Sequence, residues 1–316
     1  MSSREPFALS DVELVGLAHE NKHDLPSGLR AQVQAFATTP PPAGCMLLRW
    51  LPIGELPPTP PEPTAATGKD QATELRLLTI ATLLGEPVGY LPEHGGDVVQ
   101  NIVPVRAAAT QQTSTSSTID LMFHTEAAFH PHRPRYLLLF CLRGDAQART
   151  TFASIHQALP YLDSEVIEVL FQPRFRCAVD ESYLHGRANH LGAPMAVLTG
   201  SVAAPSMVFD ADLMVGVDEE ADEALIDLGR ALAAHPNGVV LEPGDLLIID
   251  NDVAVHGRSP FAARFDGTDR WLQRTFVVTD LAASDGERDG RVITTVFGED
   301  PDEASGAEGG GSAILH

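Results

Sequence analysis

A histidine and a glutamate two residues apart are the first candidates for chemistry in this sequence. His124 and Glu126 follow the apolar run 118–123. If that run is a strand, the two side chains project to the same face, where an imidazole and a carboxylate can occupy adjacent positions on one metal ion. Such pairs are common by chance, and a solvated loop is the alternative interpretation.

A second segment, 242–258, adds a further possible ligand. It begins with a Pro-Gly-Asp turn, continues as an apolar run, and then presents His256 after the acidic stretch Asp-Asn-Asp, which we expect to be a short loop. Two histidines and one carboxylate form the facial triad of non-haem Fe(II) oxygenases, which leaves three adjacent coordination positions open. The sequence therefore predicts a metal site, and a catalytic centre, formed by His124, Glu126 and His256.

Two arginines follow His256 in the segment 266–276. Arg270 begins an apparent strand after an Asp-Gly-Thr-Asp turn, and Arg274 lies four residues further on. A guanidinium binds a carboxylate through two parallel hydrogen bonds and stays charged when buried. Beside a metal site, Arg270 is therefore a candidate to hold a carboxylate cosubstrate. An ordinary salt bridge is the alternative if the triad is absent.

The elements that would position these residues are mostly short strands. Runs rich in Val, Ile, Leu and Phe, separated by turn residues, lie at 97–105, 118–123, 136–142, 150–155, 173–178, 196–200, 206–209, 246–250, 271–279 and 291–296. Helices are expected around 153–169 and 218–234. Many short strands with irregular loops favour a jelly roll over alternating β-α-β units. The expected fold class is mainly β with flanking helices, built on a double-stranded β-helix (jelly-roll) core.

The N-terminal part of the chain is predicted to be helical. Helices are expected after Ser10, at 27–36 and at 70–84, with a strand at 45–51 and a proline-rich surface loop at 52–63. We expect one oxygenase domain over 1–300, in which helices of about 10–84 pack on a core of about 97–297. The acidic, glycine-rich segment 298–316 is expected to be a disordered tail.

The composition limits which classes of partner the protein can bind and which cellular compartment it fits. A net charge of −22 argues against nucleic acid and anionic membranes as partners, because both require basic patches. No apolar run is long enough to span a bilayer, and the first residues lack the pattern of a secretory signal. Three widely separated cysteines fit a reducing compartment, so we expect a cytoplasmic protein. Its oligomeric state stays open.

Taken together, the segments resemble a known enzyme family. The pattern H-T-E…P-G-D-L-L-x-x-D-N…H-G-R…D-G-x-D-R-W-L-x-R is similar to that of the clavaminate synthase-like Fe(II)/2-oxoglutarate oxygenases, most of all to bacterial hydroxylases of free arginine and asparagine. The resemblance covers about 98–280. It implies Fe(II) bound by His124, Glu126 and His256, with 2-oxoglutarate as cosubstrate and O₂ as oxidant.

The resemblance also implies roles for residues around the metal. Arg270 matches the arginine that binds the distal carboxylate of 2-oxoglutarate, and Arg274 matches the arginine that holds the carboxylate of the amino-acid substrate. Glu126 is also implied to meet the substrate's α-amino group. A threonine hydroxyl that assists 2-oxoglutarate is implied at Thr150 or Thr151, of which Thr151 is preferred.

The end of the pocket that binds the substrate side chain is predicted at Asp210 and Asp212. In the arginine and asparagine hydroxylases, an aspartate in the matching place contacts the nitrogenous end of the substrate. Two carboxylates two residues apart suit a guanidinium, whereas one suffices for an amide. Solvated turn residues are the alternative interpretation. The segment 179–182 is a further candidate for the pocket wall.

The predicted function is hydroxylation of an unactivated C–H bond, at C3 (the β-carbon), of a free L-amino acid with a nitrogenous side chain. Arginine is the first choice, followed by asparagine and lysine, and the expected setting is antibiotic or other natural-product biosynthesis. One alternative is a clavaminate synthase-like desaturase or cyclase acting on a modified amino acid. A zinc hydrolase would need no clamp for 2-oxoglutarate, and a non-catalytic jelly-roll binding protein should have lost a ligand or an arginine.

Overall fold

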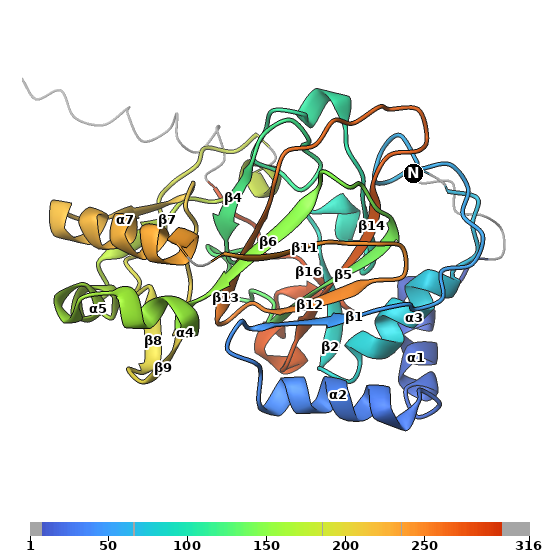
Figure 1. Cartoon of the computed structure of the whole chain (residues 1–316), viewed down its shortest axis with the longest axis horizontal. Helices are drawn as coiled ribbons and strands as arrows, with labels where there is room; N and C mark the ends of the chain where they lie inside the picture. Colours follow the sequence, from blue (N-terminus) through green and yellow to red (C-terminus); the bar gives the residue numbers. More distant parts are fainter. Residues whose placement is uncertain (1–7, 66, 185, 235, 299–316) are drawn as a thin grey trace, which may run out of the picture.

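The structure is a computed structural model that describes residues 8–65, 67–184, 186–234 and 236–298. The segment predicted to be an acidic tail lies outside these residues from 299 onward. Figure 1 shows a central group of strands with helices at both ends of the molecule. The architecture is mainly β with a jelly-roll core, as expected from the sequence.

The larger sheet forms one wall of the jelly roll. Its strands, in spatial order, are β1 (Cys45–Leu48), β12 (Leu246–Asp250), β5 (Tyr136–Arg143), β14 (Trp271–Val278), β2 (Glu86–Tyr90), β16 (Val292–Ile293) and β15 (Arg288–Asp289), with β3 (Gln100–Ile102) also paired to β14. All pairs are antiparallel except β16 with β2. This wall carries both predicted arginines at or beside β14.

The smaller sheet forms the opposite wall, in the order β11 (Asn237–Val240), β6 (Arg149–Ser154), β13 (Ala254–Arg258) and β4 (Leu121–His124). Side chains of both sheets share one hydrophobic core, in which Leu139 and Leu247 of the larger sheet pack with Phe152 and Val239 of the smaller one. The jelly roll thereby brings β4 and β13 together, although they lie far apart in the sequence.

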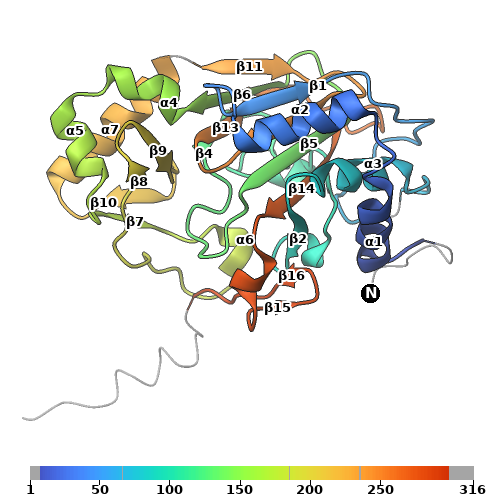
Figure 2. The same cartoon turned by 90° about the horizontal axis from the view of Figure 1, so that it is seen from below.

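Helices cover the outer face of the larger sheet, which explains the continuous apolar run of β5. Leu138 and Phe140 point away from the inter-sheet core and pack with Phe36 and Leu77. These two belong to α2 (Ser27–Thr38) and α3 (Ala72–Ala81), while α1 (Asp11–Asn21) packs against α3. Figure 2 shows α2 crossing over β1 and β5. Among the described residues, no helix is both long and apolar enough to cross a bilayer.

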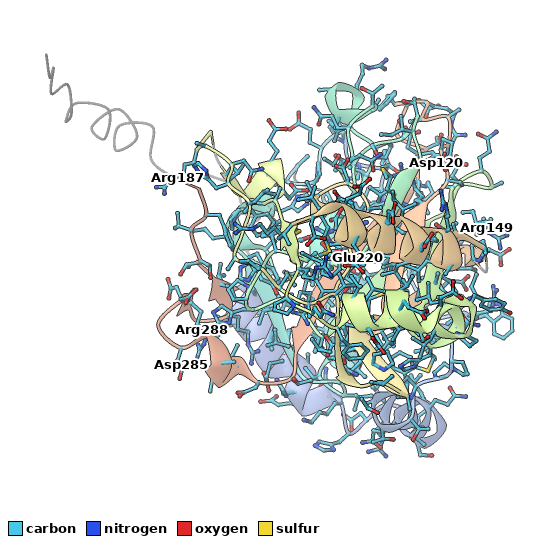
Figure 3. All side chains as sticks on the ribbon, turned by 90° about the vertical axis from the view of Figure 1, so that its left-hand side faces the viewer. Asp120, Arg149, Arg187, Glu220, Asp285 and Arg288 are labelled. Carbon is cyan, nitrogen blue, oxygen red and sulfur yellow. The ribbon has the colours of Figure 1, made fainter. Side chains whose placement is uncertain are left out.

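A side lobe extends from the smaller sheet. It contains α4 (Ile155–Ala158), α5 (Ser164–Leu170) and α7 (Glu219–Ala234), together with the hairpin of β8 (Leu198–Ser201) and β9 (Ala204–Met207) and the pair β7 (Phe175–Cys177) and β10 (Met214–Gly216). The outer surface of this lobe is charged, as Figure 3 shows around Glu220 of α7. A short helix, α6 (Glu181–Leu184), follows β7.

The helix expected at 153–169 is wrong as a single element. The strand β6 continues to Ser154, and two short helices follow, separated by a 3₁₀ turn at Leu159–Tyr161. Pro160 has no N–H to continue α4, and Asp163 has the extended backbone of an N-cap, so a new helix begins at Ser164. The predicted helix at 218–234 is confirmed as α7.

A buried histidine makes stability depend on pH. His130 is 2% exposed, and its ring packs edge-on against Tyr90 at a centroid distance of 5.0 Å and lies 5.1 Å from Phe297. Its Nδ1 accepts the backbone N–H of His132 at 2.9 Å. Burial, helped by the charge of His132, lowers the pKa of His130 to about 3. The unfolded chain, with an ordinary histidine pKa, therefore binds one more proton between about pH 6.5 and pH 3.

Replacing His130 with phenylalanine should remove this dependence. The depressed pKa means that the wild type keeps this part of its stability above pH 6.5 and loses it as the pH falls. Between pH 6 and pH 4, the free energy of unfolding of metal-free wild type should fall more steeply than that of His130→Phe, by about 1.4 kcal/mol per pH unit. Chemical denaturation at several pH values measures both slopes. The control variant His23→Gln, changed at an exposed position, should keep the wild-type slope. If the slopes of wild type and His130→Phe were equal, His130 would not be the group that makes stability depend on pH.

Candidate active site

The pairing of β4 with β13 places the two predicted histidine ligands side by side. His124 and His256 are direct partners in the antiparallel register, and their ring centroids lie 4.3 Å apart. Glu126 follows β4 by two residues, and one donor atom from each of the three residues lies within 4.8 Å of the others. The expectation that a loop presents His256 is wrong, because His256 lies in the middle of β13.

Close approach of these two strands depends on the glycine after His256. A Cβ atom on Gly257 would lie 2.4 Å from the backbone oxygen of Leu121, a distance that real Cβ atoms do not show. The register also shifts between His256 and Arg258, which marks an irregularity in the pairing. A side chain at position 257 would therefore push β4, and with it His124, away from His256.

The imidazole of His124 is oriented by its own strand. Its Nδ1 lies 2.8 Å from the backbone oxygen of Met122, which can only accept, so Nδ1 carries the proton. The other ring nitrogen, Nε2, then carries a free lone pair. A hydrogen bond on one imidazole nitrogen is the usual way in which proteins orient the other toward a metal. The Nε2 atom of His256 lies 3.5 Å from Oε2 of Glu126.

The protonation states of the cluster suit a divalent cation. Burial raises the pKa of Glu126, but the positive charge of Arg274, together with the contacts to His256 and His124, outweighs burial and lowers that pKa to about 2. Burial, together with His124, lowers the pKa of His256 to about 4. At neutral pH the site therefore holds a carboxylate and a neutral imidazole, which are the forms that bind metals. Oε2 of Glu126 is buried without a hydrogen-bond partner among the described residues, and such an oxygen fits a metal ion.

The second predicted arginine, Arg274 of β14, lies against this cluster. It is 5% exposed, its Nη1 lies 3.4 Å from Oε1 of Glu126, and its Nε donates to Oε1 of Gln100 at 2.9 Å. Its Nη2 pairs with the carboxylate of Glu93. Arg274 therefore lies between two carboxylates at the wall of the pocket.

Sequence reasoning missed Glu93. Burial, with the charges of Glu126 and Asp180, raises the pKa of Glu93 to about 7, although Arg274 opposes this shift. The residue lies in a turn after β2, within a stretch of turn residues that carries no motif. Only the pairing of β2 with β14 brings it next to Arg274, so no local signal in the sequence could have identified it.

The first predicted arginine, Arg270, lies beside a separate small cavity. It is 6% exposed, and among the described residues no carboxylate lies within ion-pair distance of it. Its Nη2 lies 3.5 Å from the hydroxyl of Thr150, and the cavity is lined by Ile102, Ser114, Leu121, Leu139, Thr150, His256, Gly257, Arg258, Arg270, Leu272 and Arg274. A buried cation without a counter-charge is a strong binding site for an anion.

The threonine next to Arg270 is not the preferred one. Thr150 contacts Arg270 and lines the cavity, whereas Thr151 does not line it. Neighbouring residues of a strand point to opposite faces, so an error of one residue in register exchanges the two side chains completely. The contact therefore favours Thr150 over Thr151 as the hydroxyl beside Arg270.

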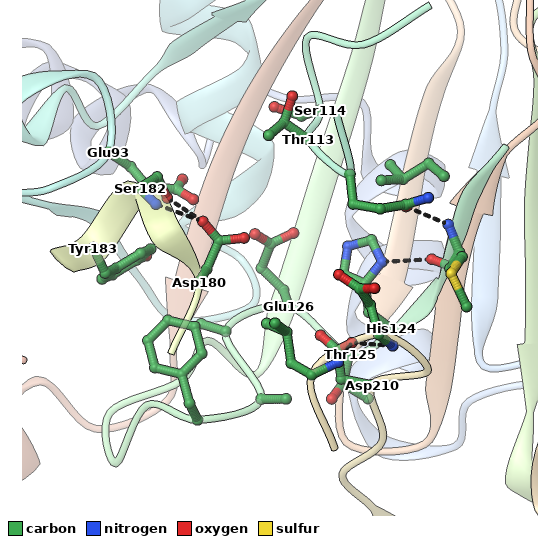
Figure 4. A pocket seen from close by; sticks show the side chains of 18 of the residues that line it. Glu93, Thr113, Ser114, His124, Thr125, Glu126, Asp180, Ser182, Tyr183 and Asp210 are labelled. Carbon is green, nitrogen blue, oxygen red and sulfur yellow. Dashed lines mark hydrogen bonds between the residues drawn. The ribbon is translucent and has the colours of Figure 1, made fainter. Parts of the chain in front are cut away.

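A larger pocket opens on the other side of the cluster, and its wall is acidic. Glu93, Glu126, Asp180, Asp210 and Asp212 all line it. Figure 4 shows Asp180 and Ser182 on one side of Glu126, and Asp210 beside His124 on the other. The predicted candidates Asp210 and Asp212, and Asp180 and Ser182 of the segment 179–182, therefore lie at the same pocket as the predicted ligands.

Asp210 is held in a fixed orientation. It is 9% exposed, and its Oδ1 accepts the backbone N–H groups of Asp212 and Leu213, both at 2.9 Å. Burial raises the pKa of Asp210, although His124 and the backbone N–H groups of Leu213 and Asp212 oppose the shift. Asp212, by contrast, is exposed at the edge of the pocket. Asp210 can thus present its second oxygen to a ligand without moving.

Residues 66–276 match the taurine catabolism dioxygenase TauD, TfdA family. L-asparagine oxygenase of Streptomyces coelicolor is 40% identical over 294 residues, which cover 90% of this chain and 86% of the relative. L-lysine 3-hydroxylase of Catenulispora acidiphila is 39% identical over 281 residues, which cover 87% of this chain and 78% of the relative.

Solved structures show the same likeness. The non-haem iron oxygenase OrfP in complex with Fe, succinate and (3S)-hydroxy-L-Arg superposes with a TM-score of 0.82 at 31% identity, covering 91% of this chain and 92% of that chain. The same protein with Fe and alpha-ketoglutaric acid gives a TM-score of 0.82 at 33% identity, with the same coverage of 91% and 92%.

Proposed function

This chain belongs to the taurine catabolism dioxygenase TauD, TfdA family, and on that premise we propose the substrate and the site of its reaction. The chain is an Fe(II)- and 2-oxoglutarate-dependent oxygenase that hydroxylates an amino acid. We propose that the substrate is a free L-amino acid with a nitrogenous side chain, arginine first and then asparagine or lysine, and that the β-carbon is hydroxylated.

One observation carries the assignment of the site. Three metal-binding side chains converge within 4.8 Å, and the adjacent cavity contains Arg270, a buried cation without a carboxylate partner among the described residues. The first feature fits Fe(II), and the second fits the dicarboxylate 2-oxoglutarate. A zinc hydrolase has no use for such a cation, so the combination favours the oxygenase.

The protein's own groups would hold iron and cosubstrate as follows. His124, Glu126 and His256 would ligate the metal, and Arg270 with Thr150 would bind the distal carboxylate of 2-oxoglutarate. Bound iron and cosubstrate together activate O₂ for cleavage of an unactivated C–H bond. The protein contributes orientation and a buried cavity that excludes bulk water.

The main-chain atoms of the substrate would bind between Arg274 and the two glutamates. Arg274 offers its guanidinium to the α-carboxylate, and Glu93 with Glu126 accepts the α-ammonium. In the structure these carboxylates already neutralise Arg274, so a zwitterion can replace internal ion pairs with equivalent ones. Because Glu126 would hold both the metal and the α-ammonium group, we propose that the β-carbon is the side-chain carbon presented for hydroxylation.

The acidic wall supports the choice of a cationic substrate. Asp210 and Asp212 come from one turn and can each accept an N–H of a guanidinium, while Asp180 adds a third carboxylate to the pocket. An apolar or acidic side chain would leave the buried carboxylate of Asp210 without a positively charged partner, which is unfavourable. Arginine therefore makes the fullest use of the wall.

We also propose a cellular compartment, a domain extent and a metabolic setting for the protein, each from a single observation. The cysteines Cys45, Cys141 and Cys177 are free and buried, which supports a reducing cytoplasm. Residues 1–300 are proposed to act as one oxygenase domain, because helices α2 and α3 share a core with the larger sheet. A hydroxylated free amino acid is not a standard protein building block, so we propose that it serves natural-product or antibiotic biosynthesis.

A panel of free amino acids tests this proposal. Protein reconstituted with Fe(II) in the absence of O₂ is given 2-oxoglutarate, one amino acid and then air, and succinate is measured. We expect arginine to raise succinate formation most, followed by asparagine, lysine and related compounds. If no amino acid raises it above background, and the zinc-loaded protein hydrolyses a substrate instead, the proposal is wrong.

Asp210→Asn should weaken binding of cationic substrates selectively. The change removes a fixed buried carboxylate, so the KM for arginine should rise by about tenfold or more, while the KM for a neutral substrate such as asparagine changes by less than about threefold. Steady-state kinetics with both substrates provides the test. Glu220→Gln removes the same charge on the surface of α7 and should leave both KM values unchanged. An equal rise for both substrates would contradict the assignment of Asp210.

A further inference from the structure

The proposed metal ligand Glu126 lies beyond the strand that precedes it. The strand β4 ends at His124, and residue 127 has a left-handed backbone with φ of 51°. The backbone of Glu126 is therefore not part of the ladder between β4 and β13. Its carboxylate nevertheless has to stay within coordination distance of two histidines, so another group must hold this residue.

That group is the side chain of Asn251. Its Oδ1 accepts the backbone N–H of Glu126 at 2.7 Å, and its Nδ2 donates to the backbone oxygen of the same residue at 3.1 Å. Nδ2 also donates to the backbone oxygen of Pro134 at 2.9 Å. The amide thus replaces the missing neighbouring strand. Its orientation is determined by chemistry, since an inverted amide would set its oxygen against two carbonyl oxygens.

Asn251 itself is firmly held. Its side chain is 0% exposed, and its backbone N–H donates to the backbone oxygen of Arg135 at 2.9 Å. Its neighbours Asp250 and Asp252 both pair with the guanidinium of Arg135. The same turn leads directly into β13, which carries His256. One buried side chain therefore links the segment of Glu126 to the element of His256.

We propose that Asn251 is a positioning residue for the metal centre: it holds the backbone of Glu126 so that the carboxylate and His256 bind the same ion. The proposal rests on the proposed metal ligands. Residues that orient metal ligands typically contribute ten- to a hundredfold to metal affinity. Loss of the amide should therefore appear in metal binding itself, before any turnover.

Asn251→Asp is the most informative variant, and Co(II) is the probe. The substitution preserves shape but places a carboxylate oxygen against the carbonyl oxygens of Glu126 and Pro134. Its added negative charge would by itself strengthen cation binding, so weaker binding reports lost geometry. We expect metal-free full-length Asn251→Asp to bind Co(II) at least about tenfold more weakly, with an altered visible absorption spectrum.

The chain offers a matched control. Asn189 makes the same two contacts to Val179, accepting its N–H at 3.1 Å and donating to its oxygen at 2.8 Å, but Val179 is not a metal ligand. Asn189→Asp should bind Co(II) within about twofold of wild type, with an unchanged spectrum. Wild-type affinity in Asn251→Asp, or an equal loss in Asn189→Asp, would overturn the proposal.

A measurement on the unaltered protein covers the case in which Asn251→Asp does not fold. In metal-free wild type, the backbone amide of Glu126 should exchange its hydrogen slowly, because Asn251 binds it in a buried position. Exchange at the rate of an exposed turn amide would mean that Asn251 does not hold this residue before metal binds, and would overturn the proposal. Slow exchange would support the proposal that Asn251 holds Glu126. An error in the proposed metal ligands would instead appear in the separate test on His256.

Discussion

Replacing His256 with alanine should abolish hydroxylation, lowering kcat by at least about 10³-fold. His256 provides one of three metal-binding atoms, and it lies in β13 between two paired strands, where no other described side chain can take its place. Loss of a ligand from a three-residue site removes the metal at ordinary concentrations. Product formation and Co(II) binding should therefore disappear together.

The fold should survive this change. His256 is already neutral at pH 7, and removing its ring leaves a small cavity that costs about 1–3 kcal/mol of stability. His156→Ala removes an imidazole from the side lobe, where it contacts the backbone oxygen of Pro205, and should keep near-normal turnover. Turnover retained by folded His256→Ala would mean that the ligand set is misassigned.

The second large effect is expected at Arg274. In Arg274→Met, the KM for the amino acid should rise by about a hundredfold or more, because the substrate carboxylate loses its only proposed cationic partner. Stability should fall by about 3–5 kcal/mol, since Glu93 and Glu126 stay buried without the guanidinium between them. The KM for 2-oxoglutarate should change by less than about threefold.

Arg270→Met supplies the reciprocal control. Arg270 lines the smaller cavity but not the larger pocket, whereas Arg274 reaches both, so loss of Arg270 should raise the KM for 2-oxoglutarate and spare that for the amino acid. Steady-state kinetics with each substrate varied in turn separates the two patterns. If both variants raised the same KM, the assignment of one arginine to each carboxylate would be wrong.

The predicted ligands could be located because their chemistry is local in sequence. The pair His124 and Glu126 follows an apolar strand, and His256 follows a Pro-Gly-Asp turn and a second strand. The antiparallel pairing of β4 with β13 brings His124 next to His256, a contact that the sequence motifs only predict. Hydrophobic runs likewise located the buried strands β5, β12 and β14.

Local sequence patterns do not identify the other features of the site. The strand β13 has the sequence Ala-Val-His-Gly-Arg, in which a glycine and two polar residues hide its buried character, so it is missing from the strands predicted from the sequence. The choice between Thr150 and Thr151 requires the register of the strand, because neighbouring side chains point to opposite faces and the sequence does not show which face each one occupies. Glu93 and Asn251 act through partners far away in sequence, at Arg274 and Glu126, and only the folded chain reveals them.

Mass analysis of the product tests the central claim most directly. Fe(II)-loaded enzyme is incubated with 2-oxoglutarate, air and arginine, and the amino acid and succinate are quantified together. The expected product is arginine heavier by one oxygen atom, with a hydroxyl on its β-carbon, formed together with one succinate per molecule. An amino acid that loses two hydrogens, or no succinate with any cationic or amide amino acid, would contradict hydroxylation of a nitrogen-rich free amino acid.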